Sequence, residues 1–327
     1  KYMQSVPVHA AVSESVALCR RMRKASAAGL VNAVLRRAAA VDVGKETFES
    51  ETQRLCVQYS VSQPGAELLQ RQLPAYAERL LAASFEKPAL AVRVNTLRTT
   101  PQALSAQLAA HGVKARPGRV ANSLVLEGAG DVAALPEFCS GLFHVQGEAS
   151  QAACAALAPR PGEKVLDMCA APGGKSATLA QYMENKGALF SRDAVQSRVP
   201  LIEETLARLG VSCANICCAD ARIYDAVLDG ADAVLCDVPC TGLGVLAKKP
   251  DIRYKSLEGL EELYTVQRAI LHTSARYVRP GGRLVYSTCT VNPQENEAAV
   301  QAFLAGHPGF CLRRAGCAVP GALEADG

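Results

Sequence analysis

The sequence predicts an α/β protein whose largest domain is a doubly wound parallel sheet. Two observations lead to this fold class. In the second half of the chain, short apolar segments alternate with longer segments of helical periodicity, as they do when helices connect parallel strands. The chain has 327 residues and changes in character near residues 60 and 160, so it is long enough for more than one core. We therefore expect three domains, at residues 1–58, 59–150 and 151–327.

The first domain is expected to be all α. Residues 13–18 and 28–40 carry apolar side chains at helical spacing, including Leu30 and Val34, and the second range is rich in alanine. No strand pattern interrupts them. The helical pattern is already under way at the first residue, so we expect part of a larger helical domain.

The second domain is expected to be a small α+β module. Short strand patterns at residues 90–94, 123–126 and 142–145 accompany a helical pattern at residues 101–111. Pro117-Gly118, Gly128 and Gly130 mark turns between them.

The third domain is expected to be the doubly wound sheet. Strand patterns at residues 164–168, 188–192, 214–218, 233–238 and 283–287 alternate with helical patterns at 176–183, 199–209 and 257–278. Ligands of such sheets bind beyond the carboxyl ends of the strands. The residues that follow each predicted strand are therefore the candidates for chemistry.

Composition and charge limit the classes of function. The formal charge of +4 and the basic clusters at residues 20–24, 36–37 and 248–249 are compatible with a nucleic-acid partner, although each cluster alone is better explained as a solvated face. The thirteen cysteines contain no C-x-x-C pair, and no apolar run approaches the roughly 18 residues of a membrane span. We expect a cytoplasmic protein with no membrane segment and no metal site.

A glycine-rich loop follows the first strand of the third domain. The loop reads Cys169-Ala170-Ala171-Pro172-Gly173-Gly174-Lys175 and leads directly into a helix. Glycines at such a turn let backbone amides approach a ligand closely, although a tight turn without a ligand has the same composition. The loop matches neither G-x-G-x-x-G nor G-x-x-x-x-G-K-[ST], so neither a dinucleotide nor a phosphate loop is indicated.

Two aspartates extend this expected site. Asp193 ends the second strand, where a carboxylate can accept hydrogen bonds from ribose hydroxyls, and Asp220 follows the third strand, towards the adenine edge. Either aspartate alone could be a helix N-cap. Together with the loop they form a nucleoside site without a phosphate cradle, which favours S-adenosylmethionine over NAD.

Two cysteines follow the next two strands. Cys240 lies in Asp237-Val238-Pro239-Cys240-Thr241-Gly242, and Cys289 lies in Ser287-Thr288-Cys289-Thr290. Structural burial is the ordinary explanation for any one of thirteen cysteines, but two at neighbouring strand ends beside a cofactor loop point to chemistry. A thiolate that adds to carbon-6 of a cytosine makes carbon-5 nucleophilic towards a methyl group. Asp237 is placed to protonate or hydrogen-bond the ring nitrogen, and a second thiol is a candidate helper in release.

With these motifs, the chain resembles the NOL/NOP/Sun family of RNA 5-methylcytosine methyltransferases, and within it the RsmB-like type that modifies small-subunit ribosomal RNA. The resemblance covers nearly the whole chain and is carried by residues 167–175, 237–242 with Lys249-Pro250-Asp251, and 280–290. It implies a Rossmann-like S-adenosylmethionine-dependent methyltransferase domain, preceded by a small α+β RNA-binding module and a partial all-α NusB-like domain.

The resemblance also implies roles for individual residues. Cys289 is then the nucleophile, Cys240 assists product release, and Asp237 positions the base. Cofactor contacts are implied for Cys169, Ala170, Ala171, Pro172, Gly173, Gly174, Lys175, Asp193, Arg198, Asp220 and Asp237.

The implied partner is small-subunit ribosomal RNA, and a monomer is expected. Contacts with RNA are implied for Arg93, Asn95, Lys175 and Lys249, although Arg93 and Asn95 can also be explained as decoration of an edge strand. The same chemistry on transfer RNA is an open alternative. A non-catalytic RNA-binding assembly factor is disfavoured because both cysteines are present, and an oxidoreductase is disfavoured by the missing dinucleotide fingerprint.

The chain departs from the family pattern in three places. The family's usual Asp-Ala-Pro-Cys-Ser-Gly is Asp237-Val238-Pro239-Cys240-Thr241-Gly242 here. The helical domain starts part-way through. The chain also stops at Gly327, before the strands that usually close the family's sheet, so we expect a catalytic domain that is truncated at its C-terminal end.

Overall fold

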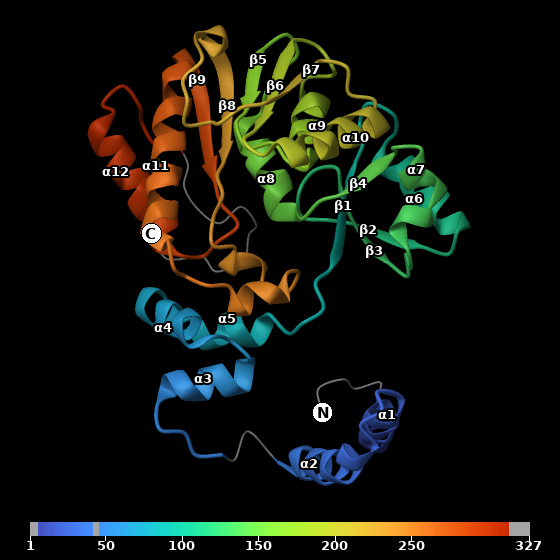
Figure 1. Cartoon of the computed structure of the whole chain (residues 1–327). Helices are drawn as coiled ribbons and strands as arrows, with labels where there is room; N and C mark the ends of the chain where they lie inside the picture. The colour runs from blue at the N-terminus through green and yellow to red at the C-terminus, as the bar shows by residue number, and fades with distance from the viewer. Residues whose placement is uncertain (1–5, 42–45, 314–327) are drawn as a thin grey trace. The chain divides into compact units, whose positions relative to one another are not determined.

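The fold is described from a computed structural model, which describes residues 6–41 and 46–313 (Figure 1). The chain forms two compact units, residues 1–67 and residues 68–327. The truncation is predicted at the end of the chain, Gly327, which lies outside the described residues.

The first unit is helical, as predicted. It contains α1 (Val8–Arg21), α2 (Ala28–Ala40) and α3 (Glu51–Tyr59), and α4 (Gln63–Gln72) begins in it. The side-chain oxygen of Ser50 caps α3 by accepting a hydrogen bond from the Gln53 amide at 3.1 Å. The apolar side chains that predicted α2 stay accessible to solvent, with Leu30 69% and Val34 54% exposed. Periodicity therefore predicted the helix correctly, although the apolar face is not buried.

The second unit contains a small antiparallel sheet with the strand order β2-β3-β1-β4. Its strands are β1 (Leu90–Val94), β2 (Lys114–Pro117), β3 (Ser123–Glu127) and β4 (Phe143–Val145), accompanied by α6 (Pro101–Ala110) and α7 (Pro136–Cys139). Val92, Leu104 and Phe143 form part of its core. The edge strand β2 was not predicted, because its residues are mostly exposed and show no apolar alternation.

The larger sheet is parallel, as predicted, with the strand order β7-β6-β5-β8-β9. Its strands are β5 (Lys164–Asp167), β6 (Ala188–Asp193), β7 (Ala214–Cys218), β8 (Ala231–Asp237) and β9 (Val278–Ser287). The strand order reverses between β5 and β8, where ligands of doubly wound sheets bind. The candidate motifs for the cofactor and for catalysis all follow strands at this end.

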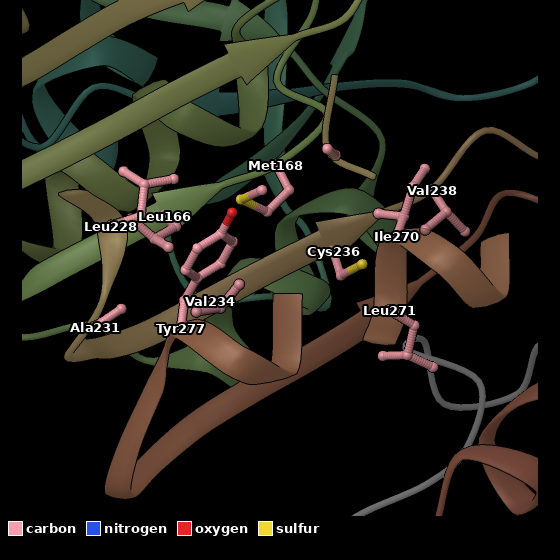
Figure 2. Close-up of a cluster of buried hydrophobic side chains, with 11 residues drawn as sticks. Leu166, Met168, Leu228, Ala231, Val234, Cys236, Val238, Ile270, Leu271 and Tyr277 are labelled. Carbon is pink, nitrogen blue, oxygen red and sulfur yellow. The ribbon is translucent and has the colours of Figure 1, made fainter. Parts of the chain in front are cut away.

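Helices cover both faces of the parallel sheet (Figure 1). On one face, α8 (Glu148–Leu157), α9 (Gly174–Tyr182) and α10 (Val199–Leu209) pack against side chains that include Val165. On the other face, α11 (Leu260–Tyr277) packs on Leu166 and Cys236, and α12 (Glu297–Gly306) packs on α11. Figure 2 shows this second cluster around Tyr277. Neighbouring residues of β5 point to opposite faces of the sheet, so Val165 is buried in the first cluster and Leu166 in the second.

Two polar side chains of β1 and its following turn fasten the small sheet to the parallel domain. The buried Arg93 donates to Gln181 on α9 at 2.9 Å and to the carbonyl of Ala121 at 2.7 Å. The buried Asn95 uses both N–H groups of its amide, on the carbonyls of Gly141 at 2.7 Å and Leu209 at 2.8 Å. The prediction that these two side chains contact RNA is wrong, because they are buried and bonded within the protein.

No helix among the described residues is both long enough and apolar enough to span a membrane.

Candidate active site

The loop after β5 is packed closely against α10. Gly173 has a φ of 102°, and a Cβ atom there would lie 3.1 Å from atoms of Ile202 and Thr205. The hydroxyl of Thr205 donates to the carbonyl of Pro172 at 2.9 Å. Glycine is needed at position 173 both for its backbone conformation and for this approach. The helix α9 starts one residue later, so its first amide groups lie at the loop.

Asp193 and Arg198 hold the same loop from the end of β6. The carboxylate of Asp193, which is 3% exposed, accepts hydrogen bonds from the amides of Ala171 at 3.2 Å and Val195 at 3.1 Å. Arg198 donates to the carbonyl of Ala171 at 3.0 Å and lies 3.5 Å from the Asp193 carboxylate. The structure therefore brings together three of the positions predicted for the cofactor.

Asp220 lies two residues beyond β7 and is paired within its own loop. The guanidinium of Arg222 donates to both of its carboxylate oxygens, at distances from 2.6 to 3.0 Å. These hydrogen bonds lower the pKa of Asp220, so the group stays ionised at neutral pH. A quarter of the Asp220 side chain remains exposed to a ligand.

A buried carboxylate beside the loop has an unused acceptor. One oxygen of Asp167 accepts a hydrogen bond from Ser176 at 2.7 Å, and among the described residues its other oxygen, although buried, has no partner. Burial raises the pKa of Asp167 to about 6. A free buried acceptor, two further carboxylates and close backbone suit a cationic nucleoside ligand better than a phosphate.

Lys175 and Asp237 form an ion pair between the loop and the end of β8. The ammonium of Lys175 lies 2.7 Å from one oxygen of Asp237, and Ser287 donates to the other oxygen at 2.6 Å. Burial lowers the pKa of Lys175, but the neighbouring Asp237 outweighs this, so the pKa is raised overall. The lysine is thus a permanent positive charge beside the residues that follow β8 and β9.

The two candidate cysteines are in contact. Asp237 and Ser287 are paired residues at the ends of β8 and β9, and the chain turns so that the sulfurs of Cys240 and Cys289 lie 3.0 Å apart. The amide of Cys289 also donates to the sulfur of Cys240 at 3.2 Å. Neighbouring parallel strands explain why residues 49 positions apart in sequence meet here.

The contact between the two sulfurs shifts the pKa values of the two thiols in opposite directions. The hydrogen bond from Cys240 lowers the pKa of Cys289 to about 7, with help from the charges of Lys175 and Lys249 and against the effect of burial. The same hydrogen bond, followed by burial, raises the pKa of Cys240. The two shifts make Cys289 the more acidic thiol of the pair, and a thiolate is the reactive form of cysteine.

The other predicted positions have simpler surroundings. Burial holds the pKa of the Cys169 thiol well above its usual range, so this group is neutral. Lys249 is exposed, and its charge acts on Cys289. Among the described residues, no group of three or more His, Cys, Asp or Glu side chains is arranged to hold a metal ion.

Sequence reasoning missed a buried polar network beneath the two cysteines. It contains Thr241, Thr290, Gln267, Asn292 and Glu295, all less than a tenth exposed. The two threonines directly follow the two cysteines in sequence. A dense run of polar residues, Asn292-Pro293-Gln294-Glu295-Asn296, was the available signal. Its carboxylate is not adjacent in sequence to either thiol, so spacing alone gave it no role.

Family models match three parts of the chain. A model described as 16S rRNA methyltransferase RsmB/F matches residues 154–323. A model of the RsmF/B-like ferredoxin-like domain matches residues 66–133, and the NusB family model matches residues 1–40. These matches agree with the expected fold class.

Individual relatives extend over most of the chain. The probable ribosomal RNA small subunit methyltransferase B of Bacillus subtilis is 34% identical over 318 residues, covering 95% of this chain and 70% of that relative. Ribosomal RNA small subunit methyltransferase B of Shewanella oneidensis is 34% identical over 309 residues, covering 93% of this chain and 70% of that protein.

Solved structures share the fold. A methyltransferase homolog protein from Pyrococcus horikoshii matches with a TM-score of 0.70 at 30% identity, covering 79% of this chain and 83% of that one. NSun6 from Pyrococcus horikoshii, solved with SFG, matches with a TM-score of 0.66 at 24% identity and covers 73% and 86% of the two chains. The second likeness is evidence for the fold alone.

Proposed function

Because the chain belongs to the RsmB/F family of 16S rRNA methyltransferases, we propose that it methylates carbon-5 of a cytosine in small-subunit ribosomal RNA through a covalent cysteine–RNA adduct. The observation that carries this proposal is the contact between Cys240 and Cys289 at 3.0 Å, beside the Lys175–Asp237 ion pair. A thiolate next to a protonated thiol suits a reaction in which a cysteine first bonds to the base and then leaves it.

Cys289 is proposed as the nucleophile. Its lowered pKa makes the thiolate available at neutral pH, and addition of the sulfur to carbon-6 places the electron pair on carbon-5. S-adenosylmethionine, proposed as the cofactor, supplies an electrophilic methyl group when bound. Loss of the proton from methylated carbon-5 then restores the ring and breaks the sulfur–carbon bond, which frees Cys289.

Asp237 is proposed to orient the base. As carbon-6 is attacked, the ring nitrogen of the cytosine takes up a proton from water, and the Asp237 carboxylate can accept a hydrogen bond from that N–H. Lys175 and Ser287 hold the carboxylate from both sides and so limit its orientation. The target base leaves its stack to reach these groups.

Cys240 is proposed to assist product release. Its raised pKa keeps a proton next to the Cys289 sulfur, where the departing thiolate is formed. Stabilising the leaving thiolate by hydrogen bonding favours cleavage of the adduct. Loss of Cys240 should therefore leave the protein attached to RNA rather than prevent attachment.

The remaining parts of the chain are assigned to binding. We propose the loop residues 169–175 with Asp193, Arg198, Asp220 and Asp237 as the cofactor site, and Lys249 with Lys175 as RNA contacts. Residues 1–58 and 59–150 are proposed as RNA-binding domains in front of a catalytic domain at 151–327. We propose a monomer that acts in the cytoplasm.

A methyl-transfer assay tests the proposal. Labelled S-adenosylmethionine is supplied with unmodified small-subunit RNA or with transfer RNA, and wild type is compared with Cys289→Ala and Cys240→Ala. Denaturing gels report covalent protein–RNA adducts. We expect labelling of the ribosomal RNA at carbon-5, no activity and no adduct with Cys289→Ala, and a trapped adduct with Cys240→Ala. Activity in Cys289→Ala, or RNA binding by wild type without methyl transfer, contradicts the proposal.

A further inference from the structure

A fully buried carboxylate lies beneath the two cysteines. Glu295 is 0% exposed and ends the short helical turn Pro293–Glu295 that follows β9. Its first carboxylate oxygen accepts hydrogen bonds from the hydroxyl of Thr241 at 2.6 Å and the side-chain amide of Asn292 at 3.0 Å. Its second oxygen accepts from the backbone amide of Thr241 at 2.9 Å and from Gln267 at 2.9 Å. Both oxygens are thus satisfied by donors that carry no charge.

The acceptor character of this carboxylate sets the direction of a hydrogen-bond chain. The hydroxyl of Thr241 uses its only proton on Glu295, so it accepts at its other contact, with the hydroxyl of Thr290 at 2.7 Å. Thr290 therefore donates to Thr241, and it accepts from the amide of Asn292 at 3.2 Å. The donor and the acceptor of each of these hydrogen bonds are therefore fixed. The series of hydrogen bonds runs from the Cys289 loop to the Cys240 loop and ends on Glu295.

The chain connects the two loops immediately next to their sulfurs. Thr241 follows Cys240, and Thr290 follows Cys289. Gln267 of α11 adds a second link to the first loop, because its amide group also donates to the carbonyl of Pro239 at 2.9 Å. The tyrosine hydroxyl of Tyr286 donates to the backbone carbonyl of Glu295 at 2.7 Å, which ties the turn itself to β9.

From these contacts we propose that Glu295 is a positioning residue, which holds the Cys240 and Cys289 loops together so that their thiols stay in contact. The proposal rests on the proposed function of these cysteines. Glu295 does not touch the reacting atoms. It acts through Thr241 and Thr290, whose hydroxyls both have hydrogen-bond partners, and a buried hydrogen-bonded network favours one arrangement of the groups that it joins. The buried Oε1 atom of Gln267 is the network oxygen that lacks a partner among the described residues.

Substitutions that keep the side-chain shape distinguish the hydrogen bonding of Glu295 and Thr241 from the packing of their side chains. In Glu295→Gln, one carboxylate oxygen becomes an NH2 group that faces two donors, so the shape is kept and the network is broken. In Thr241→Val the shape is again kept and the hydroxyl is lost, whereas Thr241→Ser keeps the hydroxyl. Glu163→Gln is a matched control, since Glu163 is 14% exposed and pairs with Arg283 near the start of β5, at the other end of the sheet.

The closeness of the two thiols can be measured without methyl transfer. Glutathione disulfide accepts the two electrons of two cysteine thiols, forming one Cys240–Cys289 disulfide and two molecules of glutathione. The rate of this disulfide is followed in the full chain by peptide mapping, and circular dichroism reports folding. We expect Glu295→Gln and Thr241→Val to slow its formation by at least about tenfold, while Thr241→Ser and Glu163→Gln stay within about threefold of wild type.

Turnover supplies the second readout. We expect Glu295→Gln to lower kcat with little change in KM for RNA or S-adenosylmethionine, and Thr241→Ser to restore most of the activity that Thr241→Val loses. If a folded Glu295→Gln protein forms the Cys240–Cys289 disulfide at the wild-type rate, the proposal is wrong. If Glu295→Gln does not fold, equal rates for Thr241→Val and Thr241→Ser overturn it. Because disulfide formation needs neither RNA nor cofactor, a chain that fails to methylate contradicts the proposed function and leaves this measurement interpretable.

Discussion

The carboxyl end of the parallel sheet has two sides that are built differently. On the side of β5, β6 and β7, the carboxylates are held by residues no more than 22 positions away, as Asp193 is by the amides of Ala171 and Val195 and Asp220 by Arg222. On the side of β8 and β9, two thiols that touch each other lie above a buried network that joins residues about 50 positions apart. The first side has the features of a binding surface, and the second has those of a site that depends on an exact distance between two atoms.

The comparison predicts that the two sides control different measurements. Cys289→Ala should reduce methyl transfer by at least about a thousandfold, because it removes the nucleophile, and should leave the Kd for S-adenosylmethionine within about twofold. Turnover with RNA measures the loss of methyl transfer, and isothermal titration calorimetry measures the affinity for the cofactor. A large loss of cofactor affinity in this variant would show that the sides are not separable.

A pH series sharpens the same contrast. With a Cys289 pKa of about 7, the thiolate is lost as the pH falls, so kcat/KM should drop about tenfold per pH unit below 7 and level off above it. Cofactor affinity should stay constant between pH 6.5 and 8.5, because the lowered pKa of Asp220 keeps it ionised and Asp167 titrates near 6. A flat rate profile from pH 6 to pH 8 would contradict the assigned acidity of the thiol.

On the cofactor side, Asp193→Asn should weaken binding of S-adenosylmethionine by about tenfold, because one oxygen that holds the loop becomes a donor that faces the Ala171 amide. The rate of Cys289 alkylation by iodoacetamide should not change, since Asp193 bonds to Ala171, Val195 and Arg198 and to neither Lys175 nor a thiol. Both are measured on the same preparation. If Asp193→Asn also slows the alkylation of Cys289, the cofactor side and the cysteine side are not independent.

The smallest expected effect concerns the exposed rim of the cysteine side. Lys249→Ala should lower RNA affinity by about threefold at 0.15 M salt and reduce the slope of log Kd against log salt by about 0.9, the value for one phosphate contact. The matched change Lys186→Ala removes an exposed lysine that pairs with Glu184 away from the site and should have no effect. If Lys249→Ala and Lys186→Ala change RNA affinity equally, Lys249 is not an RNA contact.

Two residues of β1 and its following turn were predicted to contact RNA but are buried. Arg93 and Asn95 were expected at an RNA surface because of the family resemblance, with an edge strand as the alternative, yet β1 lies between β3 and β4 and both side chains are buried. Their partners, Gln181 and Leu209, lie 88 and 114 residues further along the chain. Residue type near a strand end is therefore weak evidence for exposure.

The sequence by itself determined the features that depend on local pattern. Apolar periodicity located β7 and α10 at their observed bounds, and the motifs after the strands located the loop and both cysteines. Only the tertiary structure decided which groups touch, such as the 3.0 Å contact of Cys240 with Cys289 and the four hydrogen bonds of Glu295. The physical reason is that periodicity reports which face of a segment avoids water, whereas burial, acidity and hydrogen bonding depend on partners that folding brings from distant parts of the chain.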